Sequence, residues 1–192
     1  MRVMGIDPSL NSTGLALVDG TLTTLKQKPV DGDYRLVKIR LGIIAAISGG
    51  NRPDLVVLED LPRNAMGAGI TGQVQGVIRE VLQNNRISYL LVSAATLKKF
   101  ATGKGNAKKP DMRAAWLKHM GEDNPRDDEV DAAWLRTLGL YLTGSDDPLV
   151  AWKTPEHWEA AVANLRPAFN KLNLGASQWI KGGAKFAREG AA

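Results

Sequence analysis

Apolar residues follow two patterns along the chain as far as about residue 142. Short apolar runs bounded by Gly, Pro, Asn or Asp predict strands, whereas longer segments with apolar residues three and four positions apart predict amphipathic helices. The expected strands cover residues 3–7, 14–19, 21–26, 55–60 and 87–92. The expected helices cover residues 33–47, 70–84, 93–100, 111–120 and 126–142. Because helices and strands alternate after the third strand, the pattern predicts an α/β fold.

Tight turns join the first three strands. Pro, Asn, Ser and Gly fill the first connection, and the second contains Asp19-Gly20, which is a strong hairpin signal. These connections predict an antiparallel meander. The fourth strand is a continuous run of leucine and valine, as expected for a strand that is buried on both faces of a sheet.

A polar segment at residues 143–148 separates this part from a C-terminal tail of different composition. Residues 154–156 predict the start of a further helix, and Pro167 is expected to end it. The apolar face of this helix would comprise Trp158, Ala161, Val162 and Leu165. We therefore expect a domain at residues 1–142 and a helical, basic and partly flexible extension at residues 143–192.

Composition narrows the chemistry. The chain has 192 residues, 44% of them hydrophobic, which suffices for one core. It contains no Cys, which excludes disulfides, Cys-based zinc sites and Cys nucleophiles and leaves carboxylates as the expected metal ligands. His119 and His157 lie on predicted helices without an acidic or second-histidine partner at ligand spacing. We expect ordinary structural roles for both.

The charge balance is basic, with a formal net charge of +5 and a pI near 9.5. Together with a need for acidic metal ligands, this balance suggests a polyanionic partner. No cationic segment followed by an apolar one precedes the first strand, and no apolar run approaches the roughly 20 residues of a membrane span. We therefore expect a cytoplasmic protein without a membrane partner.

Acidic residues mark the ends of two strands and the start of the last predicted helix. Asp7 ends the first strand and Glu59 the fourth. Asp131 directly precedes an apolar Ala-Ala-Trp-Leu segment, so its inward-facing carboxylate would need a cationic partner. Asp128 shares a helix face with Asp131, but Asp127 does so too. Spacing alone does not choose between Asp127 and Asp128.

These acids have two interpretations. Asp127, Asp128 and Glu129 would complement the positive end of the helix dipole in any protein. Four carboxylates from two strand ends and one helix start also match what phosphodiester hydrolysis requires. Mg²⁺ is held by a few carboxylates together with waters and substrate phosphate oxygens. Two such ions, roughly 4 Å apart, can generate the attacking hydroxide and neutralise the leaving oxygen.

Glycine-containing segments suggest two contact surfaces. Residues 102–109 form a flexible basic loop whose lysines could reach a phosphate backbone without reading bases, although a solvated loop would look the same. Gly72 and Gly76 lie one helical turn apart, where the missing Cβ atoms would let another element approach closely. The alternative is two helix-weakening glycines in a packed helix.

Taken as an ordered set, several motifs resemble those of RuvC-like Holliday junction resolvases. Residues 5–14, Gly-Ile-Asp-Pro-Ser-Leu-Asn-Ser-Thr-Gly, resemble the first-strand motif of that family. Leu58-Glu59 resembles its second acidic strand end, and Gly72-Gln73-x-x-Gly76 its long central helix. Residues 101–109 resemble its basic loop, and residues 128–133 its final Asp-x-x-Asp helix. The likeness covers roughly residues 1–142.

The resemblance implies a ribonuclease-H-like fold. It is a mixed five-stranded sheet flanked by helices, with the first three strands antiparallel and the others parallel. It also implies a homodimer that makes paired symmetric nicks in four-way DNA junctions during recombination and repair. Mg²⁺ would be the cofactor, with two ions per active site, and Mn²⁺ would substitute for it.

The resemblance also implies roles for individual residues. The metal ligands would be Asp7, Glu59, Asp128 and Asp131, with Asp128 preferred over Asp127 by the register of the motif. Lys109 would join them in catalysis, and Lys104 and Lys109 would contact phosphate near the scissile bond. The expected DNA-binding residues are Arg63, Lys104, Lys108, Lys109 and Arg113.

The sequence departs from the family in two places. An aromatic residue often follows the second acid of the family, whereas this chain has Leu61-Pro62-Arg63-Asn64. Arg63 would stack or bind phosphate instead, so the sequence preference of the family does not carry over. The tail after Thr143 has no matched counterpart. It could dock on the domain through Trp158, extend the DNA surface through its lysines, or be partly disordered.

Three other functions compete with junction resolution. A sugar-kinase or actin-like ATP-binding domain shares the acidic strand-turn-strand motif, but it needs a second lobe and a second glycine-rich phosphate hairpin. A nuclease of the same fold could act on forks, flaps or other branched DNA. A non-catalytic junction-binding module is the third alternative, and the four acids argue against it because they would repel a phosphate backbone without metal.

Overall fold

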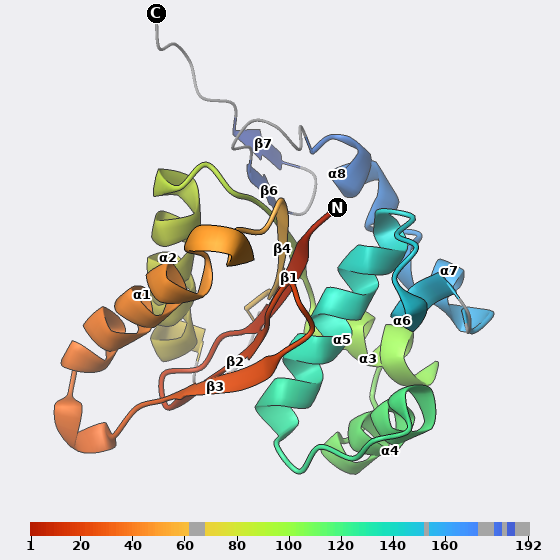
Figure 1. Cartoon of the computed structure of the whole chain (residues 1–192), viewed down its shortest axis with the longest axis horizontal. Helices are drawn as coiled ribbons and strands as arrows, with labels where there is room; N and C mark the ends of the chain where they lie inside the picture. Colours follow the sequence, from red (N-terminus) through yellow and green to blue (C-terminus); the bar gives the residue numbers. More distant parts are fainter. Residues whose placement is uncertain (62–67, 152–153, 173–178, 182–183, 187–192) are drawn as a thin grey trace, which may run out of the picture.

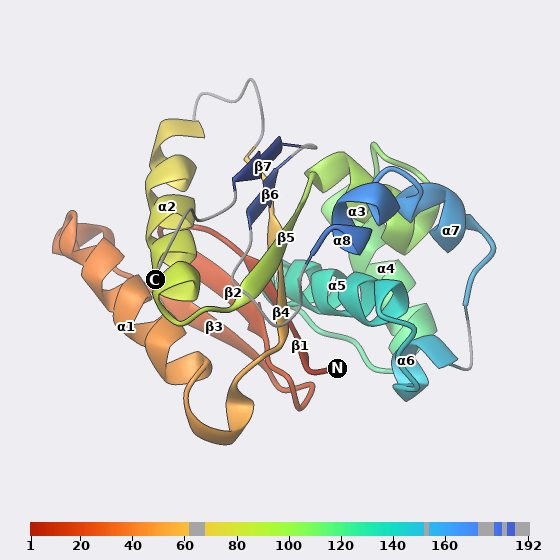
Figure 2. The ribbon, with the colours of Figure 1, turned by 90° about the horizontal axis from the view of Figure 1, so that it is seen from above.

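The computed structural model describes residues 1–61, 68–151, 154–172, 179–181 and 184–186. Its strands form one sheet in the order β3-β2-β1-β4-β5-β6-β7 (Figures 1 and 2). The strands are β1 (Val3–Asp7), β2 (Ser12–Ala16), β3 (Leu22–Lys26), β4 (Leu55–Glu59), β5 (Ser88–Val92), β6 (Trp179–Lys181) and β7 (Ala184–Phe186).

The pairing pattern of the first five strands confirms the expected mixed sheet. The first three strands pair antiparallel, and β4 pairs parallel with both β1 and β5. The tail adds two strands that the apolar pattern did not predict, since β6 pairs parallel with β5 and β7 pairs antiparallel with β6. The second expected strand was placed too late. It ends at Ala16 because Leu17 begins the turn, where its carbonyl accepts from Gly20 N.

Helices cover both faces of the sheet (Figure 2). One face carries α1 (Tyr34–Ala46) and α2 (Ala68–Asn84). The other carries α3 (Ala94–Thr102), α4 (Lys109–Met120) and α5 (Asp127–Leu142), and the tail helices follow on the same side, namely α6 (Pro148–Ala151), α7 (His157–Val162) and α8 (Arg166–Asn170). Short 3₁₀ turns, η1 (Pro29–Asp31) and η2 (Gly49–Asn51), flank α1.

Two glycines allow α5 to lie directly on the first two strands. A Cβ at Gly5 would lie 2.0 Å from Ala132 O, and a Cβ at Gly14 would lie 2.0 Å from Asp128 O. Either position would therefore force the helix away if it carried a side chain. The two glycines of the first-strand motif thus bring the start of α5 next to the end of β1.

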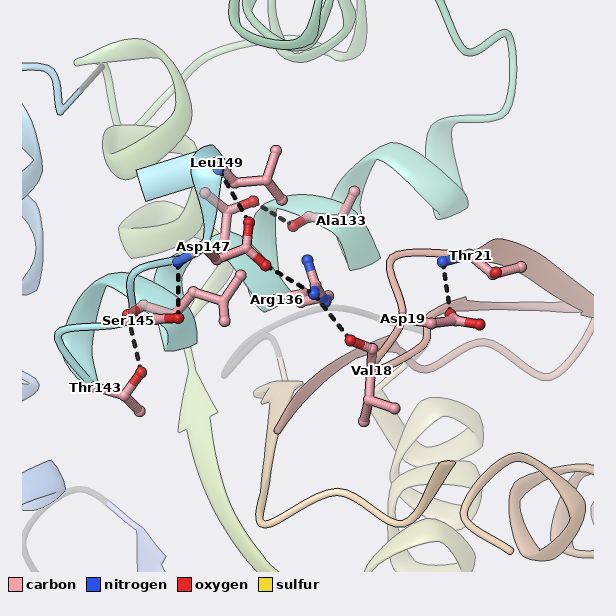
Figure 3. Close-up of polar contacts among 11 residues, drawn as sticks. Val18, Asp19, Thr21, Ala133, Arg136, Thr143, Ser145, Asp147 and Leu149 are labelled. Carbon is pink, nitrogen blue, oxygen red and sulfur yellow. Dashed lines mark hydrogen bonds and ion pairs between the residues drawn. The ribbon is translucent and has the colours of Figure 1, made fainter. Parts of the chain in front are cut away.

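A buried arginine fixes the middle of α5. Arg136 Nη2 donates to Val18 O at 3.0 Å, after β2, and to Asp147 Oδ2 at 3.1 Å, before α6 (Figure 3). Asp147 Oδ1 in turn accepts from Leu149 N at 3.0 Å. One side chain therefore links the sheet, the helix and the beginning of the tail.

The tail differs from its expected layout. The helix predicted from residue 154 begins at His157 and ends at Val162, so Pro167 does not end it. Pro167 instead lies in the first turn of α8, where a proline costs no helical hydrogen bond. The expected apolar face is nevertheless correct, because Trp158 and Val162 are fully buried. They belong to the same core cluster as residues of α3 and α5.

No helix in the part of the chain that the structure describes is long and apolar enough to cross a membrane.

Candidate active site

The first two acids are neighbours because their strands are neighbours. β1 and β4 run parallel and adjacent, with Ile6 opposite Leu58, so Asp7 and Glu59 follow at the same edge of the sheet. Gln75 of α2 fixes the end of β4, because its buried side-chain amide donates to Glu59 O at 2.9 Å. Gln75 was not among the predicted residues, since its only signal in the sequence is a polar residue on an apolar helix face.

The start of α5 brings the other acids to the same place. Asp7, Asp128 and Asp131 line one cavity of about 410 Å³, together with Ser9, Ser12, Lys109, Pro125, Arg126 and Asp127. Asp128 and Asp131 are partly buried, as is Asp7. Three of the four predicted acidic ligands therefore face a common space, and the fourth, Glu59, is adjacent to Asp7 in the sheet.

Mutual repulsion and burial act on these carboxylates. The pKa of Asp7 is raised well above its usual range, first by burial and then by the charges of Glu59, Asp131 and Asp128. Burial and the charge of Asp131 raise the pKa of Glu59 to about 7. Burial also raises the pKa of Asp131 to about 6. The acids thus disfavour each other's charged form, which is the electrostatic demand that a bound cation would satisfy.

The structure distinguishes the acids at the start of α5. Asp127 Oδ2 pairs with Lys109 Nζ at 3.1 Å, whereas Asp128 Oδ2 accepts from Ser12 Oγ at 2.6 Å. Asp128 adds to the raised pKa of Asp7, whereas both acids raise the pKa of Asp131, Asp127 more than Asp128. Both acids line the acidic cavity, so the preference for Asp128 stays a prediction from the register of the motif.

Glu129 has a structural role at the same helix start. This residue is 4% exposed, and its carboxylate accepts from Thr24, Asn124 and Arg126 at 2.9, 2.9 and 2.7 Å. Burial raises the pKa of this carboxyl and the three hydrogen bonds lower it, and the balance lies below the usual value. Glu129 therefore holds the N-terminus of α5 against β3 rather than facing the cavity.

The donor set suits a hard divalent cation. All of the expected ligands are carboxylate oxygens, which Mg²⁺ and Mn²⁺ prefer, and their clustered charge favours a cation. Among the described residues, no three Asp, Glu or His side chains are already gathered at metal-binding spacing. One of the expected ligands, Asp128, is held by Ser12 Oγ instead. The residues fit a divalent ion by chemistry and location.

Two lysines accompany the acids. Lys109 lowers the pKa of Asp7 and Asp131 by its charge. Lys98, on α3, does the same for Glu59 and Asp131. Lys98 was not among the predicted residues, because nothing in its spacing relates a lysine in the middle of a helix to acids far away in the chain. Its effect on these acids follows from the packing of α3 against α5.

Replacing Lys98 with Ala should slow the predicted metal-dependent DNA cleavage by about tenfold. The substitution removes a positive charge beside Glu59 and Asp131, where a phosphate group would have to approach a negative cluster. The rate is measured in single turnover on the DNA that the wild-type protein cuts. Lys171→Ala, which removes an exposed lysine of the tail, is the matched control, and an equal effect of both variants would contradict a local role for Lys98.

Of the predicted DNA-binding residues, Lys109 lines the acidic cavity. Lys104 and Lys108 are exposed in the loop between α3 and α4. Arg113 pairs with Asp123 at 2.8 Å beside a second cavity of about 440 Å³, which shares Lys109 and Asp127 with the acidic cavity. Arg63 lies outside the described residues.

The remaining predicted features have the following positions. A Cβ at Gly76 would meet nothing within 4 Å, so this face of α2 is open, whereas a Cβ at Gly72 would lie 3.7 Å from Leu61. His119 and His157 bond backbone carbonyls, namely Leu149 O at 2.7 Å and Phe100 O at 2.9 Å. Both histidines contact the tail or belong to it.

Several curated proteins of one name are similar in sequence to this chain. No family model matches the chain. A Nocardia farcinica protein named crossover junction endodeoxyribonuclease RuvC is 32% identical over 138 residues, which are 63% of this chain and 70% of that protein. The protein of the same name from Thermomicrobium roseum is 29% identical over 125 residues, 59% of this chain and 75% of that protein.

Solved structures share the fold. The Thermus thermophilus RuvC structure matches with a TM-score of 0.60 and 19% identity, over 75% of this chain and 96% of that one. The structure of the T. thermophilus protein in complex with a Holliday junction substrate matches with the same TM-score over 70% of this chain and 89% of that one. These matches confirm the ribonuclease-H-like fold.

Proposed function

Because this chain belongs to the RuvC family of crossover junction endodeoxyribonucleases, we propose that it cuts four-way DNA junctions by paired symmetric nicks. The observation that carries the proposal is the convergence of acids at one sheet edge under the start of α5. Asp7 and Asp131 are joined there by Glu59 and by the two lysines 98 and 109. Such a site can hold a phosphodiester group only together with cations.

A divalent metal cofactor goes with this family, and we propose Mg²⁺, with Mn²⁺ as a substitute and two ions per site. Asp7, Glu59, Asp128 and Asp131 would hold them. When bound, such a pair of ions lowers the pKa of water and neutralises charge on the leaving oxygen. Asp7 is the central ligand in this proposal because the other three acids all act on its pKa.

The chain's own groups position the DNA. Lys98 and Lys109 provide positive charge near the acids and would hold the phosphate next to the scissile bond. Asp127 keeps Lys109 in place through its 3.1 Å ion pair. Lys104, Lys108 and Arg113 extend the positive surface from this point, so the backbone of one DNA arm would pass over the loop and the beginning of α4.

Cleavage of a labelled synthetic four-way junction tests the function directly. The assay compares the junction with linear duplex, flap and fork controls, in Mg²⁺, Mn²⁺ or EDTA. Symmetric nicks confined to the junction and dependent on metal are expected. Preferred cutting of flaps or forks would reassign the substrate, and the absence of any cutting would leave a junction-binding module.

The paired nicks require two active sites, and we propose a homodimer formed through the open face of α2. Replacing Gly76 with Arg should dissociate this dimer, because the long side chain would occupy the space where the missing Cβ permits close approach. Sedimentation velocity at micromolar concentration measures the effect.

Gly50→Arg is the control for this prediction, since a Cβ at Gly50 also meets nothing within 4 Å but lies outside α2. A wild-type protein that sediments as a monomer would contradict the dimer. A Gly76→Arg protein that stays dimeric would move the interface to another face.

Stability without metal should fall as the pH rises from about 5 to 8. A carboxyl whose pKa is raised in the folded protein binds its proton more tightly there than in the unfolded chain, so it stabilises the fold at low pH and loses this contribution as the pH passes the folded pKa. The folded pKa is about 6 for Asp131 and about 7 for Glu59, so each contribution is lost as the pH rises through that value. Thermal unfolding in EDTA at a series of pH values measures it.

Divalent metal should reverse this loss. Ligand at 100 times its Kd stabilises by about 2.7 kcal/mol, or roughly 5–10 °C for a chain of this size. The metal-induced rise in melting temperature should be larger at pH 8 than at pH 5, because protonated acids do not bind metal. An equal rise at both pH values, or none, would contradict binding at these acids.

A further inference from the structure

The tail helices pack against α3, the helix that precedes the basic loop. The rings of Phe100, in α3, and Trp158, in α7, stack with their centroids 4.3 Å apart. Lys99 Nζ donates to Ala160 O of α7 at 3.1 Å. Trp158 is fully buried in this contact. The first part of the tail is therefore built into the core next to α3, the helix that carries Lys98.

Three hydrogen bonds satisfy backbone carbonyls at the C-terminal end of α3. The carbonyls of the last turn of a helix have no partners within it. Here Lys98 O accepts from Thr102 Oγ1 at 2.8 Å, Lys99 O accepts from Gly103 N at 2.9 Å, and Phe100 O accepts from His157 Nε2 at 2.9 Å. The third of these partners comes from the tail rather than from α3 or its loop.

His157 also packs on the residue where the loop leaves the helix. Gly103 has a φ of +80°, and a Cβ there would lie 3.7 Å from the His157 ring. The next residue, Lys104, donates its N–H to Thr102 Oγ1 at 3.2 Å. The imidazole thus covers the turn that sets the direction of the basic loop.

Hydrogen bonds and burial also hold the rest of the loop between Gly103 and Lys109. Ala107 is 4% exposed and its N–H donates to Lys104 O at 3.3 Å. At the N-terminus of α4, Lys108 N donates to Asp111 Oδ2 at 2.8 Å. Lys109, the first residue of α4, makes its ion pair with Asp127. A shift at Gly103 would therefore be passed to Lys109, and a tilt of α3 would move Lys98.

We propose that His157 is a positioning residue for the nuclease site. Through it the C-terminal segment fixes the position of α3 and the basic loop relative to the acids. The proposal rests on the proposed function for its effect on cleavage, but its effect on the loop stands on the contacts alone. The extension after residue 142 is then a required part of the active site, a role that its sequence did not reveal.

Three variants of the full-length protein test the proposal. His157→Ala removes both the hydrogen bond and the ring. His157→Gln keeps an N–H donor at a similar reach and is the rescue variant. Glu156→Ala changes the exposed neighbouring residue and is the control. Amide hydrogen exchange of peptides that cover residues 103–109 is measured for each, together with thermal unfolding and single-turnover cleavage of the four-way junction.

In His157→Ala, loop exchange should rise about fivefold, as expected for losing one hydrogen bond to a helix end. Cleavage should slow by about tenfold, because displaced lysines no longer meet the phosphate. His157→Gln should recover most of both losses, and Glu156→Ala should match the wild type. Exchange in α1 should not change in any variant.

The outcomes separate this proposal from the proposed function. Unchanged loop exchange in His157→Ala would overturn the positioning role, whether or not the protein cuts DNA. A fall in melting temperature with normal cleavage at 25 °C would also overturn it, since it would show a purely structural histidine. If the wild type cuts no junction, the proposed function fails, while faster loop exchange in His157→Ala would still support the link between tail and loop.

Discussion

Asp7→Asn should abolish junction cleavage, with a loss of at least about 1,000-fold. Burial and the charges of all three other acids raise the pKa of Asp7. An amide in its place cannot supply the negative oxygen that a divalent ion requires. Junction binding should persist, because it depends on the lysines and on phosphate contacts. Single-turnover cleavage in Mg²⁺ and a gel-shift assay in EDTA measure the two properties.

The same variant should be more stable than the wild type when metal is absent. Asn has nearly the shape of Asp but removes one member of a crowded set of like charges, so unfolding in EDTA at pH 8 should need a higher temperature. Asp146→Asn, at an exposed position before α6, is the control for both measurements. A destabilised Asp7→Asn protein would show that Asp7 is structural, and unimpaired cleavage would remove it from the site.

Most of the sheet could be predicted from the sequence because its signals are local. Continuous apolar runs, an Asp-Gly turn and helical spacing located five strands and five helices within a few residues. The exceptions arise where a boundary depends on tertiary contacts. Ser12 belongs to β2 because it pairs with Lys26, and no local signal placed it in a strand.

The tail shows a different limit. Its proline was interpreted as the end of a helix, whereas Pro167 starts α8, because the same residue is compatible with either position. The pairing of β6 with β5 depends on a free sheet edge far away in the chain, which the sequence does not display.

The acids of the site could be proposed from the sequence, but their partners could not. A carboxylate at a strand end is a visible pattern, whereas Lys98 and His157 act through the packing of α3. The choice between Asp127 and Asp128 illustrates the difference. Helical spacing does not separate them, whereas their contacts differ, since Asp127 pairs with Lys109 and Asp128 with Ser12.

Gly14→Ala is expected to destabilise the fold strongly. Gly14 lies opposite Asp7 in the β1–β2 pair, and an added Cβ would lie 2.0 Å from Asp128 O, a backbone atom that cannot move without α5. Overpacking against backbone should cost about 3 kcal/mol or more, which lowers the melting temperature by roughly 10 °C for a chain of this size.

Two measurements distinguish this effect from a general cost of replacing glycine. Gly69→Ala, where a Cβ would meet nothing within 4 Å on α2, should have the stability of the wild type or slightly more. At a temperature where Gly14→Ala remains folded by circular dichroism, its cleavage should still be slower than that of the wild type, because α5 carries Asp128 and Asp131 away from Asp7. A folded Gly14→Ala protein with normal cleavage would contradict the view that this glycine sets the distance between the acids.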